Sequence, residues 1–289
     1  MASAPARAIL GFQVGKPLDD PRAELEALAH ATRRAAARQQ ALGRRERARP
    51  KKKAVGAPVP ASAPARSIPA RATPAGRLDG PARTPEDVRA QAAAATDLES
   101  LRACVSRCEA CVLAKTRKQT VFMDGKGTRR LMFVGEAPGA DEDEQGLPFV
   151  GRAGKLLTDI ITKGMGIPRE EVTIANVLKC RPPENREPTP AEKATCTPWL
   201  DRQIELVDPK VIVPLGRHAA MHVLRIDAPM GAMRARVHPQ GARQIVPTYH
   251  PAYLLRSPGE KKECWKDIQL AMKELGMPIP ARSEGGSPT

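Results

Sequence analysis

LMFVGEAPGADEDEQGLPFVGRAGKLL, at residues 131–157, runs from a short apolar segment through a glycine-rich loop into a helical pattern. Leu131–Gly135 has the composition of a strand that is buried on both faces. The glycines of GEAPG (135–139) allow a tight turn and a close approach of backbone N–H groups to a ligand, although an ordinary strand-to-loop turn explains them equally well. The segment lacks the lysine of a phosphate-binding loop and the spacing of a dinucleotide-binding motif.

The alternation of strand and helix continues along the chain. Further strands are predicted at residues 172–177, 210–215 and 244–249, and helices at 85–103, 154–163, 190–206, 217–224 and 261–275. Such alternation favours an α/β domain with a mainly parallel sheet between helices. Ligands of these sheets bind at the carboxyl ends of the strands, where the GEAPG loop, Asn176 and His250 all lie.

Positive charge is concentrated in the first third of the chain. Residues 1–90 hold 18 Lys and Arg against 8 Asp and Glu, which gives +10 of the net +15. This composition and the proline-rich run after residue 50 predict four regions. They are a basic region with a helix over Pro21–Arg49 (1–49), a disordered Pro/Ala/Arg-rich linker (50–85), a globular domain (86–277) and a flexible tail (278–289).

The basic composition favours a polyanionic partner, with nucleic acid ahead of an anionic membrane. The N-terminus has no apolar core long enough for a signal peptide, and no segment reaches transmembrane length. We therefore expect a soluble, cytoplasmic protein whose six cysteines are thiols or metal ligands rather than disulfides.

Four of the cysteines form two pairs. Cys108 and Cys111 are separated by two residues, Cys180 and Cys196 by 15, and 68 residues lie between the pairs. Four thiolates brought together in a reducing cell bind zinc or an iron–sulfur cluster, and the spacing does not choose between them. Cys104 and Cys264 are expected to be packing residues, because a free cysteine behaves as a small buried hydrophobe.

Acidic side chains gather after the first apolar strand, at Glu136, Asp141, Glu142, Asp143 and Glu144. A solvated acidic loop is the simplest interpretation. Carboxylates beside nucleic-acid phosphates are repelled, however, so they would need a reason to be there, such as orienting water or stabilising a developing positive charge.

Two further side chains have both a structural and a functional interpretation. Phe149 is one of only four phenylalanines, and it is either a core residue or a platform on which a base stacks. Asn176 ends a predicted strand, where asparagine commonly forms a turn. Its amide also offers one acceptor and one donor side by side, as recognition of a base edge requires.

HPAYLLR (250–256) follows the last predicted strand. His250 is either a structural hydrogen-bonding residue or a donor to an oxygen that gains charge, with Arg256 as a nearby cation. Leu254 and Leu255 are equally well explained as core residues or as a wedge that fills the gap left by an extruded base.

Together these motifs resemble the family-four uracil-DNA glycosylases, the iron–sulfur branch of that superfamily, over about residues 100–275. The matching motifs are the first cysteine pair, GEAPG…GLPFVGRAG, NVLKCRPPENREP (176–188) and HPAYLLR, in this order. The resemblance implies a three-layer α/β/α sandwich. It also implies that Cys108, Cys111, Cys180 and Cys196 hold a 4Fe–4S cluster of structural importance, with zinc as the alternative.

The resemblance also implies a role for each candidate residue. Glu136 and Ala137 belong to the motif that handles water, where Ala137 replaces an aspartate of the classical branch and leaves Glu136 or Glu142 as the activating group. Phe149 stacks on uracil, Asn176 recognises its edge, and His250 bonds a uracil oxygen as charge accumulates. The remaining implied DNA contacts come from Leu254, Leu255 and Arg256.

The implied reaction is release of uracil from DNA, single- or double-stranded, which leaves an abasic site without a lyase step. A related branch that traps DNA covalently has a basic insertion after the asparagine motif, and this chain lacks it, so turnover is expected. We expect a monomer located with the nucleoid, with the N-terminal region as a DNA-tethering arm or a docking site for a protein. The rival classes are a non-catalytic nucleic-acid-binding metal protein and a glycosylase for another lesion.

Overall fold

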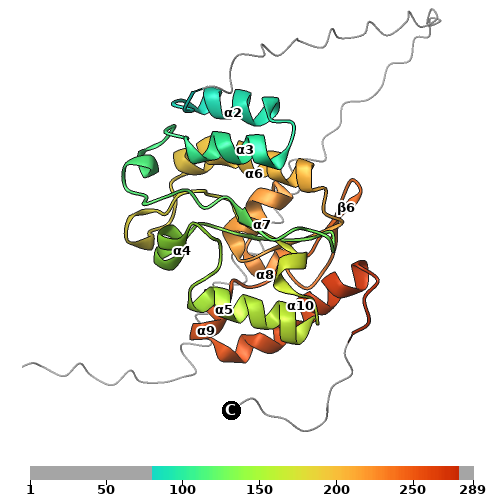
Figure 1. Ribbon diagram of the computed structural model, residues 1–289. Coiled ribbons are helices and arrows are strands. Elements are labelled where there is room, and N and C mark those ends of the chain that lie inside the picture. The colour runs from blue at the N-terminus through green and yellow to red at the C-terminus, as the bar shows by residue number, and fades with distance from the viewer. Residues whose placement is uncertain (1–79, 280–289) are drawn as a thin grey trace, which may run out of the picture. The chain divides into compact units, whose positions relative to one another are not determined.

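A single mixed sheet lies at the centre of the computed structural model, which describes residues 80–279 (Figure 1). Its strand order is β1-β3-β2-β4-β6-β5. The strands are β1 (Met123–Asp124), β2 (Leu131–Gly135), β3 (Thr173–Asn176), β4 (Val211–Pro214), β5 (His238–Gln240) and β6 (Arg243–Ile245). Strands β2, β3, β4 and β6 are parallel, and antiparallel β1 and β5 close the two edges.

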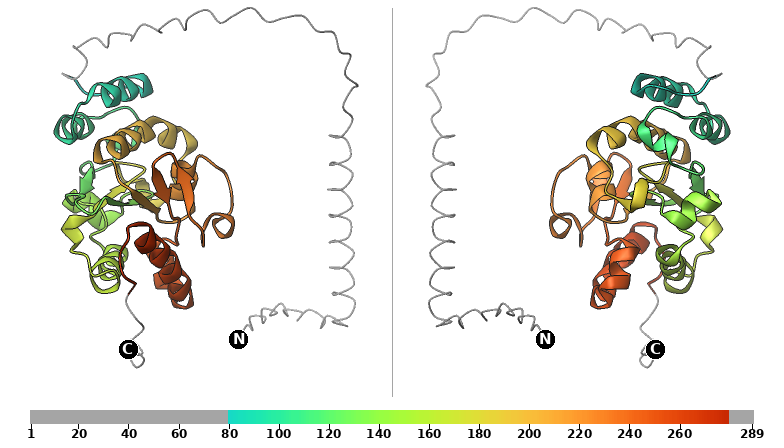
Figure 2. Two further views of the ribbon diagram at one scale, coloured as in Figure 1. Left: turned by 90° about the vertical axis from the view of Figure 1, so that its right-hand side faces the viewer. Right: turned by 90° about the vertical axis from the view of Figure 1, so that its left-hand side faces the viewer.

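The helices cover both faces of this sheet (Figure 2). One face carries α2 (Pro85–Ala94), α3 (Leu98–Ser106), α6 (Pro190–Val207) and α7 (Arg217–Leu224). The opposite face carries α5 (Arg152–Asp159), α9 (Pro251–Arg256) and α10 (Lys261–Glu274). Helix α5 continues directly into the short π-helix η2 (Ile160–Gly164). The shorter segments are η1 (Val112–Lys115), α4 (Ala140–Gln145), η3 (Arg169–Glu171), η4 (Pro183–Asn185), α8 (Met230–Met233) and η5 (Pro258–Glu260).

Strand β2 contributes side chains to two hydrophobic cores, one on each face of the sheet. Met132 and Val134 pack in the core under α2, α3 and α6, whereas Leu131 and Phe133 pack in the core under α5 and α10. Each of these side chains is 0% exposed, because a central parallel strand is covered on both faces. The predicted three-layer α/β/α fold with a mainly parallel sheet is therefore confirmed.

The largest error of the sequence prediction concerns the first helix. Residues 85–103 were expected to form one helix, but the chain makes α2 and α3 with a break between them. Asp97 accepts a hydrogen bond from Ser100 N (2.8 Å) and caps α3, so the helix restarts there. The predicted linker also extends too far, since Ala82 is fully buried in the core and Thr84 caps α2.

Other boundaries differ for local reasons. Strand β6 ends at Ile245 rather than at residue 249. Backbone pairing with β4 nevertheless continues, since Val246 N and Thr248 N donate to the carbonyl oxygens of Ile212 (2.9 Å) and Pro214 (3.0 Å). The acidic run of residues 140–145 forms helix α4 instead of a loop. The helix proposed at 21–49, most of the linker and residues 280–289 of the tail lie outside the described residues. Within residues 80–279, no helix has the length and apolar character needed to span a membrane.

Candidate active site

The carboxyl ends of the four parallel strands open into one cavity of about 590 Å³. Strand β2 delivers Glu136 and Ala137, β3 delivers Asn176, and the segment after β6 delivers His250. The chain goes from β2 to β3 on one side and later to β4 on the other, so the cavity lies where the strand order reverses, as is usual in such sheets.

Asn176 is the most deeply buried polar residue of this cavity. Its side chain is 1% exposed, and its Oδ1 atom accepts no hydrogen bond from any residue of the described range 80–279. A buried oxygen without a donor costs about 1–3 kcal/mol, which folding alone does not repay. Because Asn176 lines the cavity, its oxygen is available to a donor that enters there.

Gly135 makes room for the two side chains that define the bottom of the cavity. A Cβ atom at this position would lie 2.3 Å from Asn176 Oδ1 and 2.6 Å from two ring atoms of Phe149. The glycine of the GEAPG motif is therefore required by side-chain packing inside the cavity, rather than by a positive φ angle.

Phe149 holds its ring in the cavity through an uncommon backbone conformation. Its φ angle is +55°, its side chain is 6% exposed, and its ring centroid lies 5.6 Å from that of His250. A bulky residue at positive φ is strained, and such strain is typical of functional sites. Gly154 permits this turn, because a Cβ there would lie 1.9 Å from the carbonyl oxygen of Phe149.

Glu142, one of the two carboxylates expected to activate water, is held by backbone hydrogen bonds. One carboxylate oxygen accepts a hydrogen bond from Gly139 N (3.0 Å), and the other accepts from Val150 N (2.9 Å) and Gly151 N (3.0 Å). Both oxygens accept hydrogen bonds from backbone N–H groups, which favours a structural role for this carboxylate. The residue ties the start of α4 to the turn that carries Phe149.

His250 is held as a neutral imidazole. Its Nδ1 atom accepts a hydrogen bond from Ala252 N (3.1 Å), which leaves the ring proton on Nε2. Burial, and then the positive charge of Arg256, lower the pKa of His250 to about 4. At neutral pH the ring is therefore an uncharged donor in the cavity.

Glu136 stands at the edge of the cavity within a cluster of charged groups. Its carboxylate is 4.0 Å from His218 Nε2, and the same nitrogen is 3.1 Å from Glu187 Oε1. Burial raises the pKa of Glu136, and His218 and Lys193 oppose that rise. The predicted carboxylate is thus present at the cavity, and its environment controls whether it is ionised.

The HPAYLLR motif divides into buried and exposed residues. Leu254 is 1% exposed and packs in the core beneath α5, so its side chain is a core residue and not a surface contact. Leu255 is 43% exposed, and Arg256 lines the cavity. Of the two leucines, only Leu255 can reach DNA without unfolding.

The four paired cysteines line one small pocket under α6, as predicted from their spacing. Arg117 Nη1 and Lys179 N each donate a hydrogen bond of 3.3 Å, to Cys180 Sγ and Cys196 Sγ respectively. Burial raises the pKa of Cys180 to about 11, so a thiolate here needs a positive partner. Over residues 80–279, no three His, Cys, Asp or Glu are arranged to hold a metal ion. Cys104 and Cys264 are buried packing residues, as expected.

Two chains of contacts join the cysteine pocket to the cavity. Lys179, which precedes Cys180, is 1% exposed and donates to the Asn176 carbonyl oxygen (2.7 Å) and to Gln203. Burial lowers the pKa of its ammonium group to about 8. The second chain of contacts starts at Arg117. The next residue, Lys118, donates its backbone N–H to the buried carboxylate of Asp143 on α4 (3.0 Å). These contacts connect the residues beside the cysteines to the Asn176 backbone and to α4.

Several residues of the cavity have no candidate role in the sequence analysis. They are Asn185, Arg186, Glu187, His218 and Tyr253. Arg186 pairs with buried Glu192 (2.6 Å), whose pKa it lowers to about 2. His218 is the second residue of the helix predicted at 217–224, close to the end of the strand predicted at 210–215, and functional side chains lie at such carboxyl ends, so its position could have identified it.

Comparisons with known proteins agree with this geometry. Residues 122–269 match the family model of the uracil DNA glycosylase superfamily. The chain is 41% identical over 188 residues to a type-4 uracil-DNA glycosylase of Sulfurisphaera tokodaii, which covers 62% of this chain and 85% of that protein. It is 46% identical over 156 residues to the type-4 enzyme of Thermotoga maritima, with 53% and 80% covered. A type-5 enzyme of Pyrobaculum aerophilum is 33% identical over 145 residues, with 43% and 62% covered.

Proposed function

The chain belongs to the type-4 branch of the uracil-DNA glycosylase superfamily, and we propose that its cavity takes up a deoxyuridine flipped out of DNA and releases uracil. The products are free uracil and an abasic site in the DNA. The observation that carries this proposal is the buried Asn176 amide, whose Oδ1 atom lacks a donor in the described part of the chain.

Asn176 supplies the selectivity for uracil. Its oxygen accepts the uracil N3–H, and its NH₂ group donates to the O4 atom beside it. Cytosine presents an unprotonated ring nitrogen and an amino group at these positions. The Asn176 oxygen would then face another acceptor, and its NH₂ group would face another donor. Because such buried mismatches are costly, the site rejects cytosine.

Phe149 and its fixed turn contribute binding energy. Extrusion of a base costs a few kcal/mol, and less from single-stranded DNA. Stacking on an aromatic ring returns about 1–3 kcal/mol per base. The space left by Gly135 and the hydrogen bonds that Glu142 accepts hold the ring in place before DNA arrives, so little conformational entropy is lost on binding.

His250 and Glu136 act on opposite charges as the N1–C1′ bond breaks. The departing uracil gains negative charge, which the Nε2–H of neutral His250 stabilises by donating to a uracil oxygen. The sugar gains oxocarbenium character, which the Glu136 carboxylate stabilises while it orients the attacking water. The water oxygen adds to C1′, and its released proton balances the protonation of uracil.

We also propose that the four cysteines hold a 4Fe–4S cluster. The four thiols line one pocket, and four cysteine thiolates are a ligand set that an iron–sulfur cluster takes, with zinc as the alternative. When bound, the cluster cross-links the two cysteine pairs. The hydrogen bonds from Arg117 and Lys179 to the sulfurs fit thiolate ligands and connect the site to the cavity.

The cluster proposal has a direct spectroscopic test. Anaerobically purified protein should be brown, and Cys196→Ser should lose visible absorption and thermal stability together. The matched control is Cys264→Ser, a buried cysteine outside the pocket, which should keep the absorption. A colourless wild type that contains one zinc ion per chain would overturn the iron–sulfur assignment and leave the glycosylase proposal intact.

The reaction itself is tested with single-stranded oligonucleotides that contain one deoxyuridine, one deoxyinosine or one thymidine at the same position. We expect strand scission at deoxyuridine only, and only after alkali, because the proposed reaction has no lyase step. Scission at deoxyinosine alone would favour an enzyme for another lesion, and scission without alkali would contradict the hydrolytic mechanism.

A further inference from the structure

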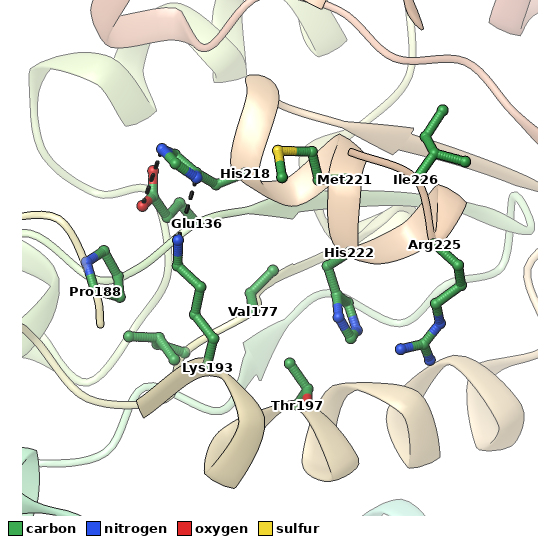
Figure 3. A pocket seen from close by; sticks show the side chains of 11 residues that line it. Glu136, Val177, Pro188, Lys193, Thr197, His218, Met221, His222, Arg225 and Ile226 are labelled. Carbon is green, nitrogen blue, oxygen red and sulfur yellow. Dashed lines mark hydrogen bonds and ion pairs between the residues drawn. The ribbon is translucent and has the colours of Figure 1, made fainter. Parts of the chain in front are cut away.

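A second cavity of about 260 Å³ adjoins the active site between α6 and α7 (Figure 3). Glu136 and His218 line both cavities, so these two side chains form part of the wall between them. His218 comes from the first turn of α7, directly after the turn that follows β4. The side chain of Lys193, on α6, points up toward the same histidine (Figure 3).

The contacts of His218 fix the position of its ring proton. Lys193 Nζ lies 3.2 Å from His218 Nδ1. An ammonium group only donates hydrogen bonds, so Nδ1 must accept and the proton must be on Nε2. That N–H faces two carboxylates, Glu187 at 3.1 Å and Glu136 at 4.0 Å.

Glu136 depends on this histidine for its electrostatic support. Among the residues that the structure describes, His218 is the one basic side chain within 4.0 Å of the Glu136 carboxylate. Lys193 contacts the histidine and pairs with Glu187 at 3.5 Å, and its positive charge also lowers the pKa of Glu136. The carboxylate therefore faces an N–H group whose orientation is set by the Lys193 ammonium.

We propose that His218, held by Lys193, is a positioning residue that aims the Glu136 carboxylate at the bound nucleotide and keeps it ionised. The inference rests on the role of Glu136 given above. His218 itself does not touch the reacting atoms, so its effect is exerted through Glu136.

The surroundings of Glu136 determine the expected dependence on pH. Burial raises the pKa of Glu136, His218 and Lys193 lower it, and Glu187 raises it. The ionised form stabilises the oxocarbenium sugar, so the rate falls as pH drops through the pKa of Glu136. Loss of His218 removes a lowering influence and moves this acid limb to higher pH. The other titratable or charged groups that line the active site are Glu142, Arg186, His250, Tyr253 and Arg256.

His222 provides a matched control. It lies one turn further along α7, lines the same second cavity, and places Nε2 3.0 Å from Asp201 Oδ1 on α6. It makes no ion pair with Glu136. His222→Ala removes a comparable α6–α7 contact, so it reports what packing alone contributes.

The test measures single-turnover uracil release between pH 5 and 9, together with affinity for DNA containing a non-cleavable deoxyuridine analogue. His218→Ala should lower the rate by about 10- to 100-fold and move the acid limb to higher pH, with DNA affinity unchanged. His218→Gln should recover most of the rate, because its side-chain N–H reaches the position of Nε2. His222→Ala should behave as wild type.

Two further variants separate the inference from the function on which it rests. Glu136→Gln should lose the acid limb and most of the rate, and the double variant with His218→Ala should be no slower. Full activity in Glu136→Gln would overturn the role of Glu136 itself. Two results would overturn only the positioning role. In the first, Glu136→Gln releases uracil slowly while His218→Ala keeps the wild-type rate; in the second, the double variant is slower than Glu136→Gln alone.

Discussion

At the scale of single residues, the site is marked by polar groups that folding leaves incompletely used. Asn176 Oδ1 is buried and has no hydrogen-bond donor among the described residues. Since His250 Nδ1 accepts a hydrogen bond from Ala252 N, the ring proton of His250 is on Nε2. Phe149 keeps a positive φ angle in a buried position. The unpaired oxygen and the positive φ angle each have an energetic cost in the free protein, which under the proposed function a bound uracil offsets by hydrogen bonding and stacking.

His250 gives a prediction for both rate and stability. His250→Ala should slow single-turnover uracil release by about 10²–10³-fold, the usual cost of one lost donor to a developing oxyanion. The folded-state pKa of about 4 lies below the ordinary value of 6.5, so the folded protein binds fewer protons between these values. The free energy of unfolding should therefore decrease as pH falls from 6.5 to 4.

Thermal unfolding of the wild type and of His250→Gln over this range checks the second part. The variant has no titrating group at the position, so its midpoint should fall less between pH 6.5 and 4. Parallel curves for the two proteins would show that His250 is not held in its neutral form.

At the scale of the elements, the loops at the strand ends are coupled to one another by close steric fits. Strand β2 ends in a glycine whose missing side chain admits both Asn176 and Phe149. Gly135→Ala should lower the rate of uracil release at least 100-fold and the free energy of unfolding by about 1–3 kcal/mol, as overpacking does. Urea unfolding and single-turnover kinetics measure the two effects.

Gly231→Ala is the control for this substitution. Gly231 lies in α8, where an added Cβ atom would meet no neighbouring atom within 4 Å, and its φ angle is not positive. The change should leave the rate intact and stabilise the helix slightly. A wild-type rate in Gly135→Ala would contradict the packing described for the base of the cavity.

The sequence predicted the elements better than their connections. Strand β2 and helix α7 were placed correctly because their apolar patterns are strong, and strand-end reasoning brought Glu136, Asn176 and His250 to one cavity. The backbone contacts of Glu142 could not be predicted, because they join the start of α4 to the turn before α5 and depend on tertiary packing. The position of His218 near a strand end was a signal for the site, but its pairing with Glu136 could not be predicted because the two residues are distant in sequence.

At the scale of the whole molecule, charge is divided unevenly between the catalytic domain and the segment before it. Residues 1–79 hold 16 Lys and Arg against 6 Asp and Glu, which is +10 of the net +15. We propose that this segment tethers DNA. A chain that begins at residue 80 should then bind single-stranded DNA more weakly, with a shallower dependence on salt, and still release uracil at the wild-type rate when DNA is saturating.

The measurement is the slope of log affinity against log salt concentration, compared between the two chains. Replacement of Lys51, Lys52 and Lys53 by Gln in the full chain serves as a control and should reduce the slope by a smaller amount. An unchanged slope after truncation would assign DNA binding to the catalytic domain alone.

The most direct test of the central claim is single-turnover uracil release from a single-stranded oligonucleotide with one deoxyuridine, by the wild type and by Asn176→Ala. The visible spectrum and the melting temperature of both proteins are recorded on the same preparations. The wild type should release all the uracil, and the variant should be slower by about 10²-fold or more with an unchanged spectrum and fold. Wild-type release by a folded Asn176→Ala variant would contradict the claim that this buried amide recognises uracil.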